Sequence, residues 1–345
     1  MIPDVQAAET VNIIDQLESI ILEEKENSYF GHVTKLRVFQ DKIYVFDGRY
    51  AKAVFIYTLD GKYITTIGNQ RGNGPLDFVS VSNFEIDYVN KKLIVMDNFG
   101  QKFMIYGLDG NFIERAGSKI SVTDAVLLPN NHFVHAKARY SYRISGQSDN
   151  CIFITDKNNN IVKEGFAHDD NKNLKIHSYG IINALPNGEI NFAPMFRDTI
   201  YRLSFDSISP KYAIDYGKNK KILKSQIDIL QSPNELFQLI EDGGMCFIGD
   251  HVESEDFLYL FIGYWMNPVS VFYNKKTNNT IAVSHKNDIY FDLYSVLCSD
   301  NEGYFYGAFN NNEIHELTSW FPNLKELEDK TDLNPILFKY KITTD

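Results

Sequence analysis

The chain has 345 residues, 14% of them aromatic, and carries a formal net charge of -11 at pH 7. This charge argues against binding to the phosphate backbone of nucleic acids, which depends on lysine and arginine contacts, and disfavours a role at an anionic membrane surface. No apolar run approaches the roughly 18 residues of a membrane-spanning helix. As written, no basic region precedes an apolar one, so no signal peptide is predicted. The protein is therefore expected either to be cytoplasmic or to have lost an export signal.

The first apolar segment, residues 19–24 (SIILEE), has no local strand with which to pair. We expect it to be a strand that pairs with the far end of the chain, preceded at most by a short helix. The alternative is a short amphipathic helix, because Val11, Ile14, Leu17 and Ile21 also have helical spacing.

Residues 33–68 contain four short runs rich in β-branched and aromatic residues, which is the composition of half-buried strands. Turn residues separate the runs, and the last two runs are joined by Asp60-Gly61. Asp-Gly between alternating runs indicates a hairpin, because Gly accepts a positive φ without steric cost. Four antiparallel strands in a meander make one blade of a β-propeller.

The same unit recurs along the chain. Its second strands begin at Ile43, Leu93, Phe133, Ile190, Leu258 and Tyr304. These starts lie roughly 40 to 70 residues apart, near the spacing of propeller blades. Fourth strands can be found for five units only, so residues 19–24 are expected to complete the sixth blade and remove an open strand edge. The predicted fold is all-β: a six-bladed β-propeller of four-stranded antiparallel blades in a single domain, 1–345, with the ring closed by the N-terminal strand.

Two stretches depart from the strand pattern and predict small helical inserts. Residues 220–241 have apolar residues near helical spacing, and Ser232-Pro233 is a plausible helix start between blades four and five. Residues 319–329 are interpreted as a helix between the second and third strands of the last blade.

The hairpin ends Leu59-Asp60-Gly61 and Leu108-Asp109-Gly110, each followed by an aromatic residue, resemble the blade ends of NHL-type propellers. Residues 68–78 (GNQRGNGPLDF) resemble the G-x-G-P-G-E-F signature of a six-bladed β-propeller family common in Bacteroidetes. The sequence departs from that signature at Leu76-Asp77, where Gly-Glu is usual. The resemblance implies a six-bladed ring, usually exported to the periplasm or cell surface and often lipid-anchored. It also implies a function that is mostly uncharacterised, with ligand-binding modules and lyases among related propellers.

Catalytic signatures are missing from the sequence: there is no Gly-x-Ser-x-Gly, Gly-rich phosphate loop or His-Glu-x-x-His. No catalytic residue, metal site or cofactor is therefore predicted. Three cysteines, Cys151, Cys246 and Cys298, lie in apolar runs and are interpreted as buried rather than as a disulfide framework or metal site.

The predicted order of strands in each blade places a group of arginine and aromatic residues on one face of the ring. In a four-stranded blade, the loop between strands two and three and the loop to the next blade open on the same face, around the central channel. The expected ligand-binding mouth on that face comprises Arg49, Tyr50, Arg71, Asn73, Arg139, Tyr140, Arg143, Arg197, Tyr264 and Trp265. Arginine matches carboxylates, and aromatic rings stack on sugars, so these residues favour a glycan or an acidic small molecule.

The alternative is that these arginines pair with Asp47, Asp97 and Asp198 and only join neighbouring blades. The leading functional hypothesis is a non-catalytic ligand-binding or scaffold module. The others are a polysaccharide lyase or hydrolase acting at the same mouth, which would need a metal or a paired acid and base there, and a protein–protein interaction platform.

Overall fold

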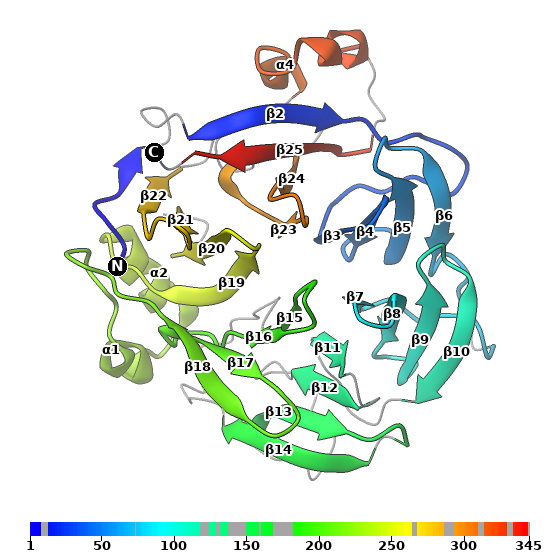
Figure 1. Ribbon diagram of the computed structural model, residues 1–345, viewed down its shortest axis with the longest axis horizontal. Coiled ribbons are helices and arrows are strands. Elements are labelled where there is room, and N and C mark those ends of the chain that lie inside the picture. The colour runs from blue at the N-terminus through cyan, green and yellow to red at the C-terminus, as the bar shows by residue number, and fades with distance from the viewer. Residues whose placement is uncertain are drawn as a thin grey trace.

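The computed structural model describes residues 1–7, 13–72, 74–117, 124–128, 132–136, 150–158, 160–167, 182–263, 268–285, 293–309, 314–329 and 334–343. Within these residues the strands form six separate sheets arranged in a ring (Figure 1). Each sheet has four antiparallel strands, and one has a fifth, parallel strand at its outer edge. The predicted six-bladed propeller is therefore confirmed.

The strands take equivalent places in the six blades. The innermost strands are β3 (Lys35–Phe39), β7 (Asn83–Asp87), β11 (Asp124–Leu127), β15 (Ile182–Ala184), β19 (Phe247–Glu253) and β23 (Cys298–Ser299). The second strands are β4 (Lys42–Asp47), β8 (Lys92–Asp97), β12 (Phe133–Ala136), β16 (Ile190–Phe192), β20 (Phe257–Ile262) and β24 (Phe305–Phe309).

The third strands are β5 (Ala53–Thr58), β9 (Lys102–Gly107), β13 (Asn150–Thr155), β17 (Thr199–Leu203), β21 (Val269–Asn274) and β25 (Ile336–Ile342). The outermost strands are β6 (Tyr63–Ile67), β10 (Phe112–Gly117), β14 (Ile161–Ala167), β18 (Ile208–Ala213), β22 (Thr280–Ser284) and β2 (Ile14–Ile20).

The N-terminus closes the ring, as the sequence predicts, but with a different segment. Strand β2 pairs antiparallel with β25, and it covers residues 14–20 instead of 19–24. A register shift between Asp15 and Glu18 lets Ile14 and Leu17, three residues apart, both pack against the core. This bulge explains the helical spacing of a segment that is a strand. Farther toward the N-terminus, β1 (Gln6–Ala7) adds the parallel fifth strand beside β22.

The two Asp-Gly hairpin turns, in blades one and two, each contact the preceding blade. Gly61 has a φ of +82° and lies against the end of β2, so a Cβ there would come within 2.3 Å of the carbonyl oxygen of Ile21. Gly110, with a φ of +83°, lies against the side chain of Thr65 on β6 in the same way. Glycine at these positions therefore permits the positive φ of the turn and also leaves room for the neighbouring blade.

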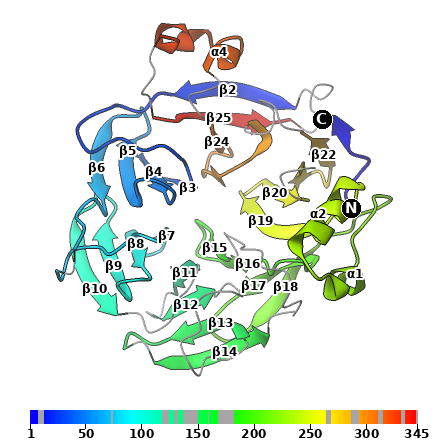
Figure 2. The ribbon, with the colours of Figure 1, turned by 180° about the vertical axis from the view of Figure 1, so that it is seen from behind.

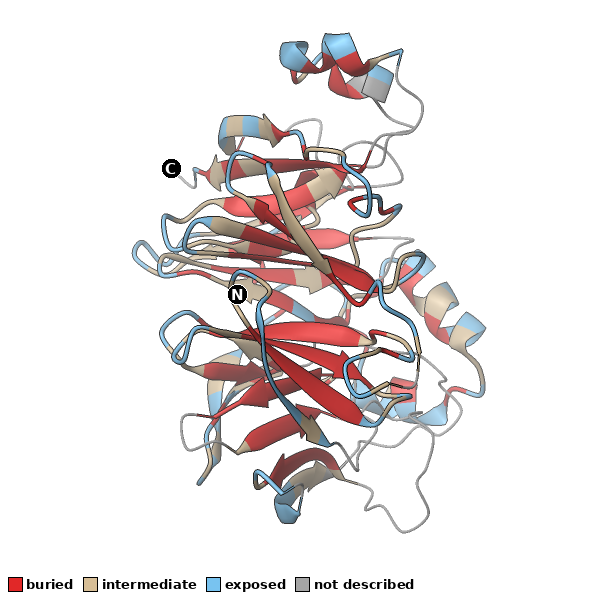
Figure 3. Ribbon diagram, turned by 90° about the vertical axis from the view of Figure 1, so that its right-hand side faces the viewer, coloured by how far each residue is buried: buried red, intermediate tan, exposed pale blue. Residues whose placement is uncertain are grey.

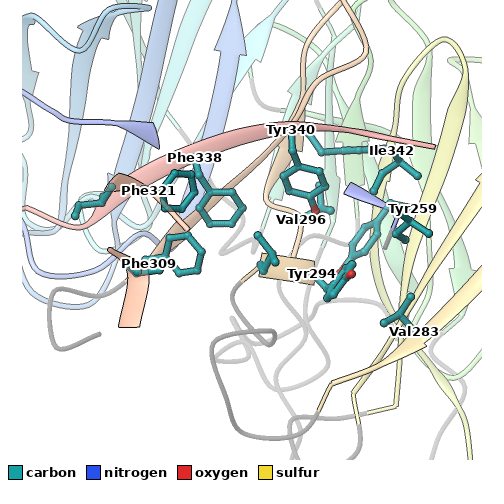
Figure 4. Packing of buried hydrophobic residues seen from close by; sticks show 14 of the residues in the cluster. Tyr259, Val283, Tyr294, Val296, Phe309, Phe321, Phe338, Tyr340 and Ile342 are labelled. Atoms are coloured by element: carbon teal, nitrogen blue, oxygen red, sulfur yellow. The ribbon is translucent and has the colours of Figure 1, made fainter. Parts of the chain in front are cut away.

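Apolar side chains fill the space between successive blades, and Figure 4 shows the cluster between blades five and six. Phe309 and Phe338 lie 4.2 Å apart between ring centroids, and Tyr259 of blade five belongs to the same cluster as Tyr340 of blade six. Aromatic pairs of this kind contribute beyond their buried area. The 14% aromatic content thus follows from the packing of sheet on sheet.

Helices lie in both connections where the sequence predicts inserts, on one face of the ring. Helices α1 (Lys224–Ile229) and α2 (Pro233–Glu241) lie between β18 and β19. Between β24 and β25 lie α4 (Ile314–Leu317) and the 3-10 helix η3 (Pro322–Leu327), in place of one helix over 319–329. The helical segments project from the same side in Figure 3, and α1 and α2 face the viewer in Figure 2. We call this side, formed by the loops between strands two and three and between blades, the helical face.

None of the helices among the described residues has the length and apolar composition needed to cross a membrane.

Candidate ligand-binding site

Two equivalent aspartates fix the loops of blades one and two on the helical face. At the end of β4, Asp47 accepts backbone hydrogen bonds from Arg49 and Tyr50, each at 2.8 Å, and from Gly31 at 3.0 Å. Burial alone would raise the pKa of Asp47, but these backbone N–H groups outweigh it and lower the pKa.

At the end of β8, Asp97 accepts from the backbone of Val79 at 2.8 Å, Ser80 at 3.3 Å and Gly100 at 2.7 Å. Each aspartate thus ties its own hairpin loop to the incoming connection from the previous blade. The alternative in which arginines pair with these aspartates is therefore wrong for Asp47 and Asp97 in the described part of the chain. Asp198, the third aspartate of that alternative, forms an ion pair with Lys221.

The fixed loop of blade one presents two of the predicted mouth residues to solvent. Arg49 is exposed, Tyr50 is 66% exposed, and the Arg49 guanidinium lies 5.6 Å from the centre of the Tyr50 ring. At the equivalent loop of blade two, Phe99 is 74% exposed. No carboxylate among the described residues forms an ion pair with Arg49.

Arg71 is exposed but is held by the same loop. Its Nη2 donates to the carbonyl oxygens of Ala51 at 2.7 Å and Lys52 at 2.8 Å. The glycine-rich segment around it folds over Asp77, which accepts a hydrogen bond from the backbone of Gly74 at 2.9 Å. A Cβ at Gly74 would come within 2.6 Å of that carboxylate. The carboxylate at position 77, where the resembled signature has Glu, therefore organises the loop from within.

Arg197 differs from these two, because it is half-buried and its guanidinium lies 4.8 Å from the centre of the Phe166 ring. The other predicted mouth residues lie outside the described part of the chain: Asn73, Arg139, Tyr140, Arg143, Tyr264 and Trp265. The structure thus brings Arg49, Tyr50 and Arg71 together on blade one.

The central channel contains a buried ionic cluster that the sequence did not reveal. Arg37 on β3 donates from Nε and Nη2 to the two carboxylate oxygens of Glu85 on β7, both at 2.9 Å. The same Nη2 reaches Asn183 Oδ1 on β15 of blade four at 3.1 Å, and Asn183 donates to the carbonyl oxygen of His251 at 2.9 Å. Blades one and four lie on opposite sides of the ring (Figure 1), so the contact of Arg37 with Asn183 spans the middle of the ring.

The opposite charges within this cluster outweigh the effect of burial on its protonation. Desolvation alone would raise the pKa of Glu85, but Arg37 and Lys35 lower it to about 2. Desolvation would lower the pKa of Arg37, and the Glu85 carboxylate raises it instead. Both groups therefore remain charged at neutral pH.

A second polar group lies nearer the helical face, where the innermost strands begin. Lys35 Nζ lies 2.9 Å from Glu85 Oε2 and 3.3 Å from Asp124 Oδ1, and Asn83 also donates to Asp124 Oδ1. Asp250 lies on the innermost strand β19, and the charge of Asp124 adds to the effect of desolvation in raising the pKa of Asp250. We call Asp124 and Asp250, with Lys35 beside Asp124, the channel floor.

A signal for the channel residues was present in the alternation of the innermost strands. In KLRVF (35–39) and NFEID (83–87), polar residues alternate with apolar ones, so the polar side chains share the face that lines the channel. The sequence reasoning placed function in the loops and did not use this alternation.

Comparisons with known proteins give the fold but no activity. A protein of Bacteroides fragilis, described as exported, has a TM-score of 0.75 and 18% identity over 99% of this chain and 98% of that chain. A member of the DUF4221 family from Bacteroides vulgatus has a TM-score of 0.59 and 11% identity over 96% of this chain and 98% of that chain. None of the curated proteins matches the chain.

A family model described as a domain of unknown function, DUF4934, matches residues 5–341, which includes every blade of the ring and both strands that close it. The chain therefore belongs to the DUF4934 family.

Proposed function

We propose that the protein is a non-catalytic ligand-binding or scaffold propeller that holds a glycan or an acidic small molecule at the channel mouth on the helical face. The observation that supports this most is the exposed pair of Arg49 and Tyr50 on a loop whose backbone is fixed by Asp47. A loop that is already ordered loses little conformational entropy when a ligand binds.

The chemistry of the rim suits such a ligand. A guanidinium offers a planar fork to a carboxylate, phosphate or sulfate group, and the face of an exposed aromatic ring can stack on a sugar. Tyr50 and Phe99 provide such rings on neighbouring blades. Arg71, donating to two carbonyl oxygens beside them, holds the loop in place.

Binding to an array of neutral and acidic glycans tests the proposal, with the double variant Arg49→Ala/Tyr50→Ala beside the parent protein. We expect affinity for the best acidic glycan to fall about tenfold or more, which corresponds to about 1.4 kcal/mol. Arg202→Ala is the matched control, because Arg202 is an exposed arginine that pairs with Glu189 in the turn before β16, on the opposite face. Equal affinity in the double variant and the parent would overturn the mouth as the binding site.

A second candidate is a polysaccharide lyase or hydrolase acting at the same mouth. It is favoured by the carboxylates of Asp124 and Asp250 at the channel floor, since acid–base chemistry requires two such groups near the substrate. Incubation with the glycans that bind, followed by analysis for shortened or unsaturated products, distinguishes the two functions. Product formation that Asp250→Asn abolishes would replace the non-catalytic proposal.

The third candidate is a protein–protein interaction platform. Several exposed apolar side chains of blades one and two belong to the helical face, namely Tyr50, Leu76, Val79 and Phe99. If the glycan array gives no ligand, a protein partner whose binding is lost in Phe99→Ser but retained in Val89→Ser supports this candidate. Val89 is an exposed apolar residue on the opposite face.

The domain extent, the cellular compartment and the relationship to NHL-type propellers are also proposals. We infer that the chain acts as a single domain over 1–345 and that the protein is exported to the periplasm or cell surface. The description of the Bacteroides fragilis structure supports export. The Asp-Gly turns, which join blade to blade, support a relationship to NHL-type propellers. Fractionation of cells that produce the protein from its natural gene tests the compartment, and recovery in the cytoplasm would contradict it.

A further inference from the structure

A buried cluster of an amine, a carboxamide and a carboxylate joins blades four and five on the face opposite the helical face. Lys211 on β18 donates from Nζ to Oδ1 of Asn191 on β16 at 3.0 Å, and to Oε2 of Glu253 on β19 at 2.8 Å. Asn191 Nδ2 donates to the same Oε2 of Glu253 at 2.7 Å. The three groups therefore contact one another in pairs, and one carboxylate oxygen contacts both the amine and the carboxamide.

The cluster is shielded from water, and its amine lies close to the amide carbon. Asn191 is 0% exposed, and the side chains of Lys211 and Glu253 are 9% and 6% exposed. A carbonyl bond is about 1.2 Å long, so Asn191 Cγ lies within about 4.2 Å of Lys211 Nζ. Atoms held in a fixed geometry react when they are roughly 3 to 3.5 Å apart. Only a small movement of the lysine side chain separates the observed arrangement from one in which the amine attacks the amide.

The position of Lys211 comes from a bulge in β18. Ile200 pairs with Tyr212 and Tyr201 pairs with Pro210, so Lys211 is an extra residue between them. A bulge redirects the side chain of the strand that contains it, and bulges are common beside active sites. Here the bulge lets a side chain of the outermost strand reach the second strand of the same blade, past the intervening β17.

The neighbouring charges remain paired when Lys211 is neutral. Glu189 lies 2.9 Å from Lys211 Nζ, and it also pairs with Arg202 at 2.9 Å. Glu253 likewise pairs with Lys275 at 3.2 Å. Without the charge of Lys211, the two carboxylates face the two cations Arg202 and Lys275. Loss of that charge therefore leaves neither carboxylate without a counter-charge, which is the costly outcome for a buried ion pair.

We propose that Lys211 and Asn191 form an intramolecular amide bond, with Glu253 as the general base. Glu253 Oε2 accepts a proton from the Lys211 ammonium, and the neutral amine attacks Asn191 Cγ. As the new bond from Nζ to Cγ forms, the amine loses a second proton. The bond from Cγ to Nδ2 breaks, and Nδ2 leaves as ammonia after Glu253 has passed a proton to it. An ammonium and a carboxamide thus become a secondary amide and a free ammonium ion, so no other reactant is needed.

The bond ties the outermost strand of blade four to its second strand. It joins residues that are 20 positions apart in the chain and closes a covalent loop around β17. The side chain of Glu189, beside Lys211, is 30% exposed, so the released ammonia has a short path to solvent. The bond lies on the face opposite the proposed mouth, and it forms whether or not a ligand binds there.

Mass spectrometry of the folded full chain tests the bond. We expect the intact mass to fall, during incubation at neutral pH, below the mass that the sequence requires by the mass of one ammonia. Trypsin cleaves after Arg197 and Arg202, which lie between the two residues. Digestion of the product should therefore give a branched peptide that contains both Asn191 and Lys211. An intact mass that stays equal to that of the sequence after prolonged incubation would overturn the proposal.

Lys211→Arg separates this bond from another loss of ammonia. The variant keeps the positive charge but removes the nucleophilic amine, so it should retain the full mass. Ring closure at the Asn187-Gly188 turn also releases ammonia, but it does not need Lys211. Loss of ammonia in Lys211→Arg to the same extent as in the parent protein would therefore overturn the proposal.

Two carboxylate variants test the role of Glu253. Glu253→Gln should slow bond formation about a hundredfold or more, because it removes the base that contacts both reacting groups. Glu189→Gln is the matched control, since Glu189 contacts the Lys211 amine but forms no hydrogen bond with Asn191 among the described residues, and it should still form the bond. Equal rates in folded Glu253→Gln and the parent protein would overturn Glu253 as the base.

Discussion

At the scale of single residues, the most consequential group is the buried ion pair of Arg37 and Glu85 on the ring axis. Two hydrogen bonds at 2.9 Å join them, and Arg37 is 8% exposed while Glu85 is 1% exposed. A buried pair of this kind adds little net stability over apolar packing, but removal of one partner leaves an uncompensated charge. The pair therefore fixes the relative position of blades one, two and four.

Replacement of Glu85 by Gln should destabilise the ring strongly, because Arg37 would stay buried without its counter-charge. We expect the free energy of unfolding at pH 7 to fall by about 3 kcal/mol or more, measured by urea denaturation. Glu18→Gln is the matched control, because Glu18 pairs with Lys339 at 55% side-chain exposure and should change stability by less than about 1 kcal/mol. Similar losses in the two variants would show that the axial pair has no special role.

The same pair predicts how acid affects stability. The pKa of Glu85 is about 2 in the folded chain against an ordinary value of 4.5. A lowered folded-state pKa gives stability that is present above pH 4.5 and lost as pH falls toward 2. In Glu85→Gln the loss of stability between pH 5 and 3 should be smaller than in the parent protein. An equally steep loss would mean that other carboxylates, such as Glu253, cause the acid sensitivity. Burial would raise the pKa of Glu253, but hydrogen bonds from Lys211, Asn191 and Tyr212 lower it to about 2.

At the scale of the element, the hairpin turns carry the contacts between blades. Gly61 and Gly303 both have φ near +80° in hairpin turns, but only Gly61 has a neighbouring backbone where a Cβ would lie. The two positions therefore separate the cost of backbone conformation from the cost of a steric clash.

Gly303→Ala should cost about 1 kcal/mol, since its φ alone is unfavourable for a side chain. Gly61→Ala should cost clearly more, because its Cβ would lie 2.3 Å from the carbonyl oxygen of Ile21 and force β2 away from blade one. Thermal denaturation of the two variants measures the difference. Equal melting temperatures would mean that this contact does not hold the closing strand.

Elements whose apolar residues alternate were predictable from sequence, whereas the bulges within β2 and β19 were not. The four strands of residues 33–68 lie where the apolar runs place them, because a half-buried strand needs a period of two. The bulges at Asp15–Glu18 and Phe247–His251 break that period, so the extent of β2 and the exposure of Asp250 follow only from tertiary pairing. Arg49 and Tyr50 could be predicted from the position of their loop in the blade. The contacts of Asp124 could not, because they come from strands of other blades.

At the scale of the whole molecule, the ring depends on pairing between the two ends of the chain. Strand β2 is the outer strand of blade six, and β1 adds to blade five. Ile2, near the N-terminus, also packs into the core between blades four and five. The described residues among the first twenty therefore contact blades four, five and six, and Ile20 also packs with apolar side chains of blade one.

Removal of residues 1–25 should lower the melting temperature of the entire ring, because it exposes the edge of β25 and opens the contact between blades six and one. Removal of residues 1–7 alone should cost less, since β2 remains. Circular dichroism during heating measures both. Melting of the longer truncation at the temperature of the full chain would contradict the closure by β2 as a source of stability.

The pairing of β2 with β25 also has a consequence for the order of events during synthesis. The ribosome releases residues 14–20 more than three hundred residues before their partner at 336–342. The final closure must therefore wait until translation is complete, and the early segment stays without its β25 partner for that whole interval. The last pair of strands can form only after the whole polypeptide is available, so every other blade is able to assemble before the ring is locked.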